Sequence, residues 1–179
     1  MTVPVTVLMP VFNNSAHLRA AIDSVLAQTH REFELIIVDD GSKDSSPEII
    51  ASYRDPRVRF ERFERNRGLA AALNHGLQAA SAPLIARQDA DDLSRPDRLA
   101  RQLRLFQERP DLVIAGSLAR SMTEQGAIVG TVQRPLEALS IRWYAVVDNP
   151  FIHSSVVFRR AEAMACGGYD VAFDPYAQD

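Results

Sequence analysis

Two aspartates spaced as Asp-x-Asp, Asp89 and Asp91, directly follow a short apolar run (83–86) that indicates a buried strand. Carboxylates at i and i+2 can point the same way on an extended segment. Mg²⁺ and Mn²⁺ take one or two carboxylates and complete their coordination with substrate phosphates and water. The pair therefore predicts a divalent-cation site that screens a diphosphate. The alternative is a solvated acidic loop that caps the helix near Pro96, which is the commoner explanation of an isolated Asp-x-Asp.

A second acidic pair, Asp39 and Asp40, ends the apolar run FELIIV (33–38). Two acidic pairs that both follow strands favour a binding site over a solvated loop. This second pair is compatible with a metal site, with a turn at Gly41, or with a carboxylate that accepts the imide N–H of a pyrimidine. Phe12 could lie against the face of a nucleobase, although burial in the core under the sheet end is equally compatible with its local pattern.

The elements that must position these residues alternate between strand and helix. Apolar runs predict strands at 3–9, 33–38, 58–60 and 83–86, the third on the edge of the sheet, and helical spacing predicts helices at 18–26, 46 onward and 68–80. Such alternation predicts an α/β fold with a mainly parallel sheet that is covered by helices on both faces. Ligands bind such sheets at the carboxyl ends of the strands, which brings together three segments: 10–14, 39–42 and 89–92.

The second half of the chain continues less regularly. We expect a helix from Pro96 to near Pro110, strands at 113–118, 128–132 and 156–158, and a helix at 136–147. Four arginines on the first of these helices are expected to form a solvated basic face: Arg95, Arg98, Arg101 and Arg104. His153, which precedes the last strand, is expected either to face a ligand or to be a satisfied structural histidine.

Composition and missing motifs exclude several classes of protein. The turn after the first strand contains no glycine, and neither G-x-G-x-x-G nor G-x-x-x-x-G-K-[ST] occurs, which argues against dinucleotide oxidoreductases and P-loop enzymes. The formal net charge of −3 argues against nucleic-acid binding. A single cysteine, Cys166, fits a reducing compartment, and the sequence offers neither a membrane-spanning run nor a signal peptide.

Several stretches together resemble family 2 glycosyltransferases of the inverting, GT-A type. They follow the family's order along the chain: PVFN (10–13), SVLAQT (24–29), FELIIVDDGSKDSS (33–46), NRGLAAALNHGL (66–77), ARQDADD (86–92), PDRLARQ (96–102), HSSVVFRR (153–160) and GGYD (167–170). No single motif is unique to that family, but the ordered set is highly specific. The resemblance implies a Rossmann-like GT-A fold and the transfer of a sugar from a nucleotide-diphosphate sugar, with uridine as the favoured nucleoside.

The resemblance also implies roles for individual residues. Phe12 would stack on the base, Asp40 would bond to it with Asp39 beside it, Asp89 would contact the ribose or the metal, and Asp91 would coordinate Mn²⁺ or Mg²⁺. The expected nucleotide-binding set is Pro10, Phe12, Asn13, Asp39, Asp40, Asn66, Asp89 and Ala90. Asp179 is the expected general base, in a position where the family commonly has a Glu-Asp pair and this chain has Gln178-Asp179. Such a base would take the proton of an acceptor hydroxyl as it attacks the anomeric carbon.

We expect a single domain over 1–179, with a nucleotide-binding half (1–92) and the start of an acceptor-side half (93–179). The chain stops without a closing helix, so we expect it to continue in a longer protein. The expected acceptor is a hydroxyl of a saccharide or a lipid-linked saccharide, in bacterial surface polysaccharide or glycolipid synthesis. The expected location is the cytoplasm, and peripheral contact with the inner face of the membrane stays open. The rival hypotheses are a module that binds a nucleotide sugar without transferring it, and a metal-dependent phosphohydrolase.

Overall fold

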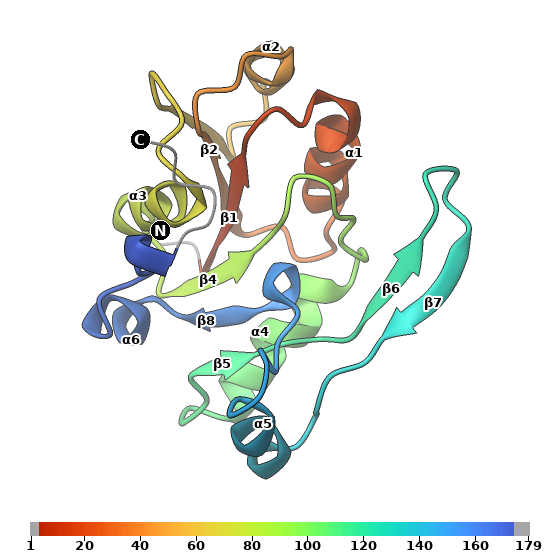
Figure 1. Cartoon of the computed structure of the whole chain (residues 1–179), viewed down its shortest axis with the longest axis vertical. Coiled ribbons are helices and arrows are strands. Elements are labelled where there is room, and N and C mark those ends of the chain that lie inside the picture. The colour runs from red at the N-terminus through yellow and green to blue at the C-terminus, as the bar shows by residue number, and fades with distance from the viewer. Residues whose placement is uncertain (1–3, 174–179) are drawn as a thin grey trace.

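The computed structural model describes residues 4–173, in which strands and helices alternate as the apolar pattern predicts (Figure 1). The first half consists of β1 (Val5–Val11), α1 (Ser15–Leu26), β2 (Phe33–Asp39), α2 (Ser46–Ala51), β3 (Val58–Arg62), α3 (Leu69–Ala79) and β4 (Leu84–Arg87). The second half consists of α4 (Arg98–Glu108), β5 (Ile114–Ala115), β6 (Ala119–Met122), β7 (Ile128–Val132), α5 (Ala138–Tyr144), η1 (His153–Ser155), β8 (Val157–Arg159), α6 (Arg160–Ala165) and η2 (Val171–Phe173).

The central sheet is six-stranded, in the order β3-β2-β1-β4-β8-β5. Strands β3, β2, β1 and β4 run parallel, whereas β8 is antiparallel to both β4 and β5. The expected mainly parallel sheet is therefore confirmed, and β3 lies on its edge as predicted. In the register of this sheet Val11 pairs with Asp39, and Leu8 pairs with Arg87. The segments that follow β1, β2 and β4 consequently emerge at the same edge.

Helices cover both faces of the sheet, because alternate residues of the buried strands point to opposite sides. On one side Val7 and Met9 pack in a core with the apolar faces of α1, α2 and α4. On the other side Leu8 packs in a second core with α3. A Cβ built on Gly76 of α3 would lie 2.0 Å from Cδ1 of Leu8, so a glycine at this position allows α3 to approach β1 closely.

The second half differs from the sequence prediction in its strand lengths. The strand expected at 113–118 is only β5, because its partner β8 is three residues long. Strand β7 matches the expected 128–132, but it pairs with β6 in a separate hairpin that projects from the body of the molecule (Figure 1). The helix expected at 136–147 is the shorter α5, and α6 was not predicted.

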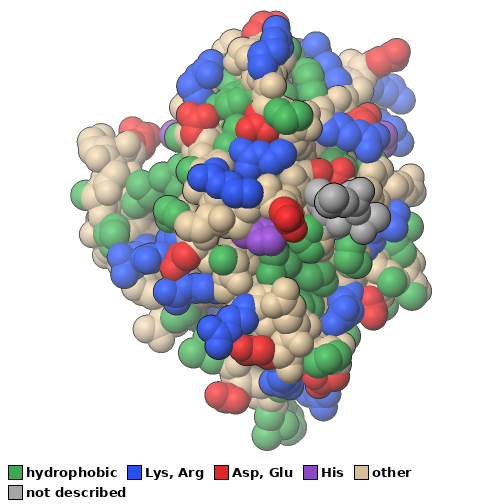
Figure 2. All heavy atoms as spheres, turned by 180° about the vertical axis from the view of Figure 1, so that it is seen from behind, with side chains coloured by type: hydrophobic (Ala, Val, Ile, Leu, Met, Phe, Trp, Pro, Cys, Tyr) green, Lys and Arg blue, Asp and Glu red, His purple; other side chains and the backbone are tan. Residues whose placement is uncertain are grey.

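The hairpin and the region of α5 expose many apolar side chains: Met122, Ile128, Val129, Leu136, Leu139, Trp143, Val146 and Val147. Among residues 4–173 no helix has the length and apolar character required to cross a bilayer. On the face seen from behind the view of Figure 1, basic and acidic side chains are interspersed rather than separated into one basic surface (Figure 2).

Candidate active site

A cavity of about 430 Å³ opens at the carboxyl edge of the sheet, where β1, β2 and β4 end. This volume lies within the range of small-ligand sites. The cavity brings together segments that are far apart in the sequence, namely Pro10, Val11, Phe12, Asn14, Asp40, Asn66, Leu69, Ala72, Asp89, Ala90 and Asp91. Most of the residues predicted to bind a nucleotide or a metal therefore share one pocket.

The aromatic side of the pocket is formed by Phe12, which directly follows β1. Phe12 is 46% exposed, so the alternative of a core phenylalanine is wrong. Pro10 and Leu69 line the same cavity. An exposed aromatic ring in a pocket with apolar neighbours provides a stacking face for a planar ligand.

Asp40 lies in the same pocket but is almost completely buried. Its Oδ1 accepts the amide N–H of Arg67 at 2.7 Å, and its Oδ2 accepts that of Gly68 at 2.9 Å. Both amides stand directly before α3, whose first amide groups have no partner within the helix. Asp40 therefore caps α3 at the same time as it faces the cavity. Asn66 supports this arrangement, since its Oδ1 accepts the amide of Gly68 at 3.1 Å.

Two residues predicted to bind the nucleotide, Asn13 and Asp39, are absent from the lining of this cavity as the described residues define it. Asp39 is fully buried, its Oδ2 lies 3.0 Å from Nε of Arg62, and its Oδ1 accepts the amide of Ser42 at 3.2 Å. The side chain of Asn13 accepts the amide of Lys43 at 2.8 Å. In this structure both residues hold the loop after β2 in place.

The loops after β1 and β2 are joined by further side-chain hydrogen bonds to backbone amides. The amides of Asn13, Asn14 and Ser15 donate to the side chains of Ser42, Ser46 and Asp44, respectively, at 2.8 to 3.1 Å. Burial acts to raise the pKa of Asp44, but hydrogen bonds from Ser46 and Ser15 outweigh it and lower the pKa to about 2. These three amides, which lead into α1, are thus already occupied and are not available to a phosphate, so we expect a cation to supply positive charge at this edge.

The acidic loop after β4 supplies two carboxylates of different character. Oδ1 of Asp89 accepts a hydrogen bond from Nη2 of Arg87 at 2.5 Å, and the side chain is 36% exposed. Asp91 is exposed and, within the described part of the chain, its carboxylate has no hydrogen bond or ion pair. No cluster of three or more His, Cys, Asp or Glu side chains among residues 4–173 could enclose a metal ion. The pair fits a cation that completes its coordination with a ligand's phosphates and water.

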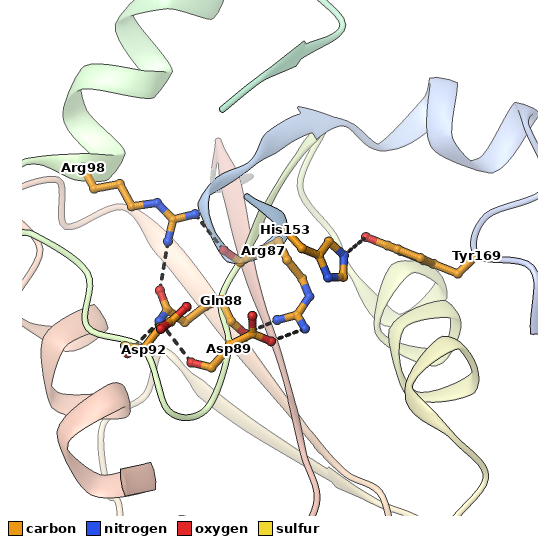
Figure 3. A network of polar contacts seen from close by, with 7 residues as sticks. All are labelled: Arg87, Gln88, Asp89, Asp92, Arg98, His153 and Tyr169. Atoms are coloured by element: carbon orange, nitrogen blue, oxygen red, sulfur yellow. Dashed lines mark hydrogen bonds and ion pairs between the residues drawn. The ribbon is translucent and has the colours of Figure 1, made fainter. Parts of the chain in front are cut away.

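A network of polar side chains lies behind this loop (Figure 3). Arg98 of α4 donates to the carbonyl of Arg87 at 2.7 Å and to Oε1 of Gln88 at 2.8 Å. The Gln88 amide in turn donates to the carbonyls of Asp89 and Asp92 at 3.1 and 2.9 Å. Burial and the charge of Arg87 lower the pKa of Arg98 to about 10, so Arg98 remains charged at neutral pH. The expectation that Arg98 is solvated is therefore wrong, whereas Arg95, Arg101 and Arg104 are exposed as predicted.

His153 of η1 lies beside Arg87, with Nε2 3.2 Å from the hydroxyl of Tyr169 (Figure 3). Burial, followed by the positive charge of Arg87, lowers the pKa of His153 to about 4. The imidazole is consequently neutral at physiological pH. The backbone of Tyr169 is held on α3 by Asn74, which donates to its carbonyl at 2.7 Å and accepts its amide at 2.8 Å.

The sequence did not single out Arg87, although a signal was present. Arg87 ends the otherwise apolar run 84–86, and a cation in a buried strand requires a partner nearby, which Asp89 provides. The expected general base, Asp179, and its neighbour Gln178 lie outside the described residues.

The sheet order and the pocket at its carboxyl edge define an α/β protein with the GT-A type of fold. The chain matches the family described as Glycosyl transferase family 2 over residues 6–162, and it belongs to that family. It is 30% identical over 169 residues to the amylovoran biosynthesis glycosyltransferase AmsE of Erwinia amylovora, a match that covers 92% of this chain and 63% of AmsE.

Solved structures that share the fold include two with a bound nucleotide. The mannosyltransferase PcManGT from Pyrobaculum calidifontis, in complex with GDP-Man and Mn²⁺, has a TM-score of 0.71 and 20% identity, covering 96% of this chain and 48% of PcManGT. S. aureus TarS 1–349 in complex with UDP has a TM-score of 0.74 and 18% identity, covering 96% of this chain and 52% of that TarS fragment. The chain thus spans less than two thirds of the length of each of these three proteins.

Proposed function

We propose that this chain forms the donor-binding part of an inverting, metal-dependent glycosyltransferase. It would bind a nucleotide-diphosphate sugar, with UDP-sugars favoured, for transfer to a hydroxyl of a saccharide or lipid-linked saccharide. The observation that carries this proposal is the shared pocket, which is lined by Phe12, Asp40, Asp89 and Asp91. Membership of the glycosyltransferase family and the nucleotide complexes of PcManGT and TarS support it.

The described residues can perform the binding part of this reaction. Phe12 offers a stacking face, and the buried carboxylate of Asp40 offers an acceptor for a ring N–H, which favours uracil over cytosine. Asp91, with Asp89, would hold Mn²⁺ or Mg²⁺. A bound cation would act as a Lewis acid that offsets the negative charge developing on the leaving nucleoside diphosphate.

The transfer step requires a base for the acceptor hydroxyl. Asp179 is proposed for this role from its place after the GGYD segment (167–170). A carboxylate base accelerates such a step by roughly a hundred- to ten-thousand-fold. Attack on the face opposite the leaving group then inverts the anomeric centre, so an α-linked donor gives a β-linked product.

Calorimetric titration with UDP, GDP, dTDP and ADP, each in Mn²⁺ and in EDTA, tests the proposal. We expect one of these nucleotides to bind in a Mn²⁺-dependent way, and Asp91→Ala to abolish that dependence while the fold is retained. Asp111→Ala is the matched control, since Asp111 is an exposed aspartate outside the pocket. Absence of binding for all four nucleotides in both conditions would refute the proposed donor site.

The same preparation distinguishes the rival hypotheses. A phosphohydrolase would release phosphate steadily from simple phosphate esters without any sugar acceptor. A non-catalytic module would bind the nucleotide sugar, yet neither this chain nor a longer form carrying the relatives' additional length would transfer the sugar to any member of an acceptor panel.

A further inference from the structure

The feature that the binding proposal leaves unexplained is the buried arginine before the acidic loop. Arg87 is the last residue of β4, its side chain has no exposed surface, and it is among the largest fully buried side chains of the described chain. An unpaired charge in a protein interior costs several kcal/mol, which is comparable to the net free energy of unfolding of a whole domain. We therefore expect the contacts that Arg87 makes to explain why a charged side chain is buried at this position.

Among the described residues the guanidinium of Arg87 makes two hydrogen bonds, both to the acidic loop. Nη2 donates to Oδ1 of Asp89 at 2.5 Å, and Nη1 donates to the backbone carbonyl of Gln88. One planar group thus holds the first carboxylate of the Asp-x-Asp pair and the peptide group that precedes it (Figure 3). Two contacts from one rigid fork set the direction of the carboxylate as well as its position.

The backbone of the loop is held independently, from the other side. Arg98 donates to Oε1 of Gln88 at 2.8 Å, and the Gln88 amide donates to the carbonyls of Asp89 and Asp92. These contacts maintain the path of the chain without touching the carboxylate of Asp89. Within this network Arg87 is the residue that contacts the carboxylate of Asp89, so its effect on that side chain can be separated from the backbone contacts of Arg98 and Gln88.

Charge gives the arrangement a second consequence. Asp89, Asp91 and Asp92 lie within four consecutive residues and repel one another when no cation is bound. The guanidinium of Arg87 offsets part of this repulsion from beneath the loop. It does so through Oδ1 of Asp89, while Oδ2 has no partner among the described residues.

We propose that Arg87 is a positioning residue for the divalent-cation site. It orients the carboxylate of Asp89 so that Oδ2 of Asp89 and the carboxylate of Asp91 can both coordinate the cation. This inference rests on the proposed function, because it assigns the cation to this loop. Lysine cannot replace arginine in this role, since an ammonium group is a compact point charge that lacks the planar fork.

The test compares UDP affinity in Mn²⁺ and in EDTA for the wild type, Arg87→Lys and Arg87→Met. The ratio of the two dissociation constants measures the metal dependence. Partners that orient a metal ligand typically contribute about 10- to 100-fold to metal affinity. We therefore expect the ratio of the two dissociation constants to fall at least about tenfold in both variants. The UDP affinity of Arg87→Lys in EDTA should be unchanged, because Phe12 and Asp40 lie on other segments of the pocket.

A double variant separates positioning from a general loss of structure. If Arg87 acts through Asp89, then Arg87→Met combined with Asp89→Asn should lose no more metal dependence than Asp89→Asn alone. Thr6→Val is the stability control: Thr6 is also fully buried in the sheet, and its hydroxyl hydrogen-bonds to Glu34 near the other end of β1. This control should keep the full metal dependence.

The outcomes are distinguishable. If the wild type shows no Mn²⁺-dependent binding of UDP, GDP, dTDP or ADP, the proposed function fails and this inference fails with it. If the wild type shows that dependence and Arg87→Lys and Arg87→Met retain it, the inference alone is overturned. It is also overturned if Thr6→Val loses as much metal dependence as Arg87→Met, or if the effects of Arg87→Met and Asp89→Asn are additive.

Discussion

The two aspartates of the acidic loop should differ sharply in their contribution to stability. Asp89→Ala leaves the guanidinium of Arg87 buried without its carboxylate, whereas Asp91→Ala removes an exposed side chain that has no partner in the described part of the structure. Breaking a fully buried ion pair costs about 3–5 kcal/mol. Because Asp89 is 36% exposed, water can reach the vacated position, so we expect a loss of about 2 kcal/mol in the free energy of unfolding. For Asp91→Ala we expect a change within about 0.5 kcal/mol.

Urea unfolding followed by circular dichroism, in EDTA and without nucleotide, measures both variants. For a domain of this size a loss of about 2 kcal/mol corresponds to a decrease in Tm of roughly 4–8 °C. Arg87→Met combined with Asp89→Ala should recover most of the loss, because a buried apolar side chain needs no counter-charge. Equal stability of Asp89→Ala and Asp91→Ala, or a double variant as unstable as the sum of its parts, would refute the reasoning.

Two further predictions concern the pocket and its surroundings. Phe12→Ala should weaken nucleotide binding by about 1–3 kcal/mol, the usual contribution of base stacking. Thermal melting should show little change in stability, because the ring is 46% exposed. Unchanged affinity would rule out stacking. His153 should make the protein less stable as the pH falls from 6.5 to about 4, since the unfolded chain binds a proton there before the folded chain does. The loss of stability from His153 is at most about 3 kcal/mol, and His153→Gln should remove it. The variant should still lose stability at lower pH, because the pKa values of Asp44 and Asp55 are lowered to about 2. A urea midpoint for His153→Gln that falls with pH as steeply as the wild type's would contradict this assignment.

The sheet and the pocket were predictable because their signals are local in the sequence. Buried parallel strands appear as continuous apolar runs, and parallel topology places the segments that follow them at one edge. Phe12, Asp40 and the acidic loop were therefore brought together correctly. The short β5 was not predictable, because its extent depends on the length of the distant partner strand β8. Strand β7 was predicted, but its partner β6 was not, so the separate hairpin was missed.

The polar network behind the acidic loop was missed for a different reason. Arg98 has the sequence spacing of an exposed helix face, and only the packing of α4 against the end of β4 turns it toward Gln88. Likewise the different roles of Asp39 and Asp40 depend on their neighbours. Asp39 pairs with Arg62 and accepts the amide of Ser42, whereas Asp40 accepts the amides that precede α3. Adjacent identical residues on a strand end point to opposite sides, so composition alone cannot distinguish their roles.

The capping of α3 by Asp40 has a consequence for engineering altered donor preference. The same carboxylate faces the pocket and accepts the two amides that precede α3, so a substitution intended to change base recognition also loosens a helix that carries part of the core. Members of a library that varies position 40 would lose this capping, which typically contributes about 0.5–2 kcal/mol to stability. Phe12, whose side chain is 46% exposed, offers a route to new donors at a smaller cost to the scaffold.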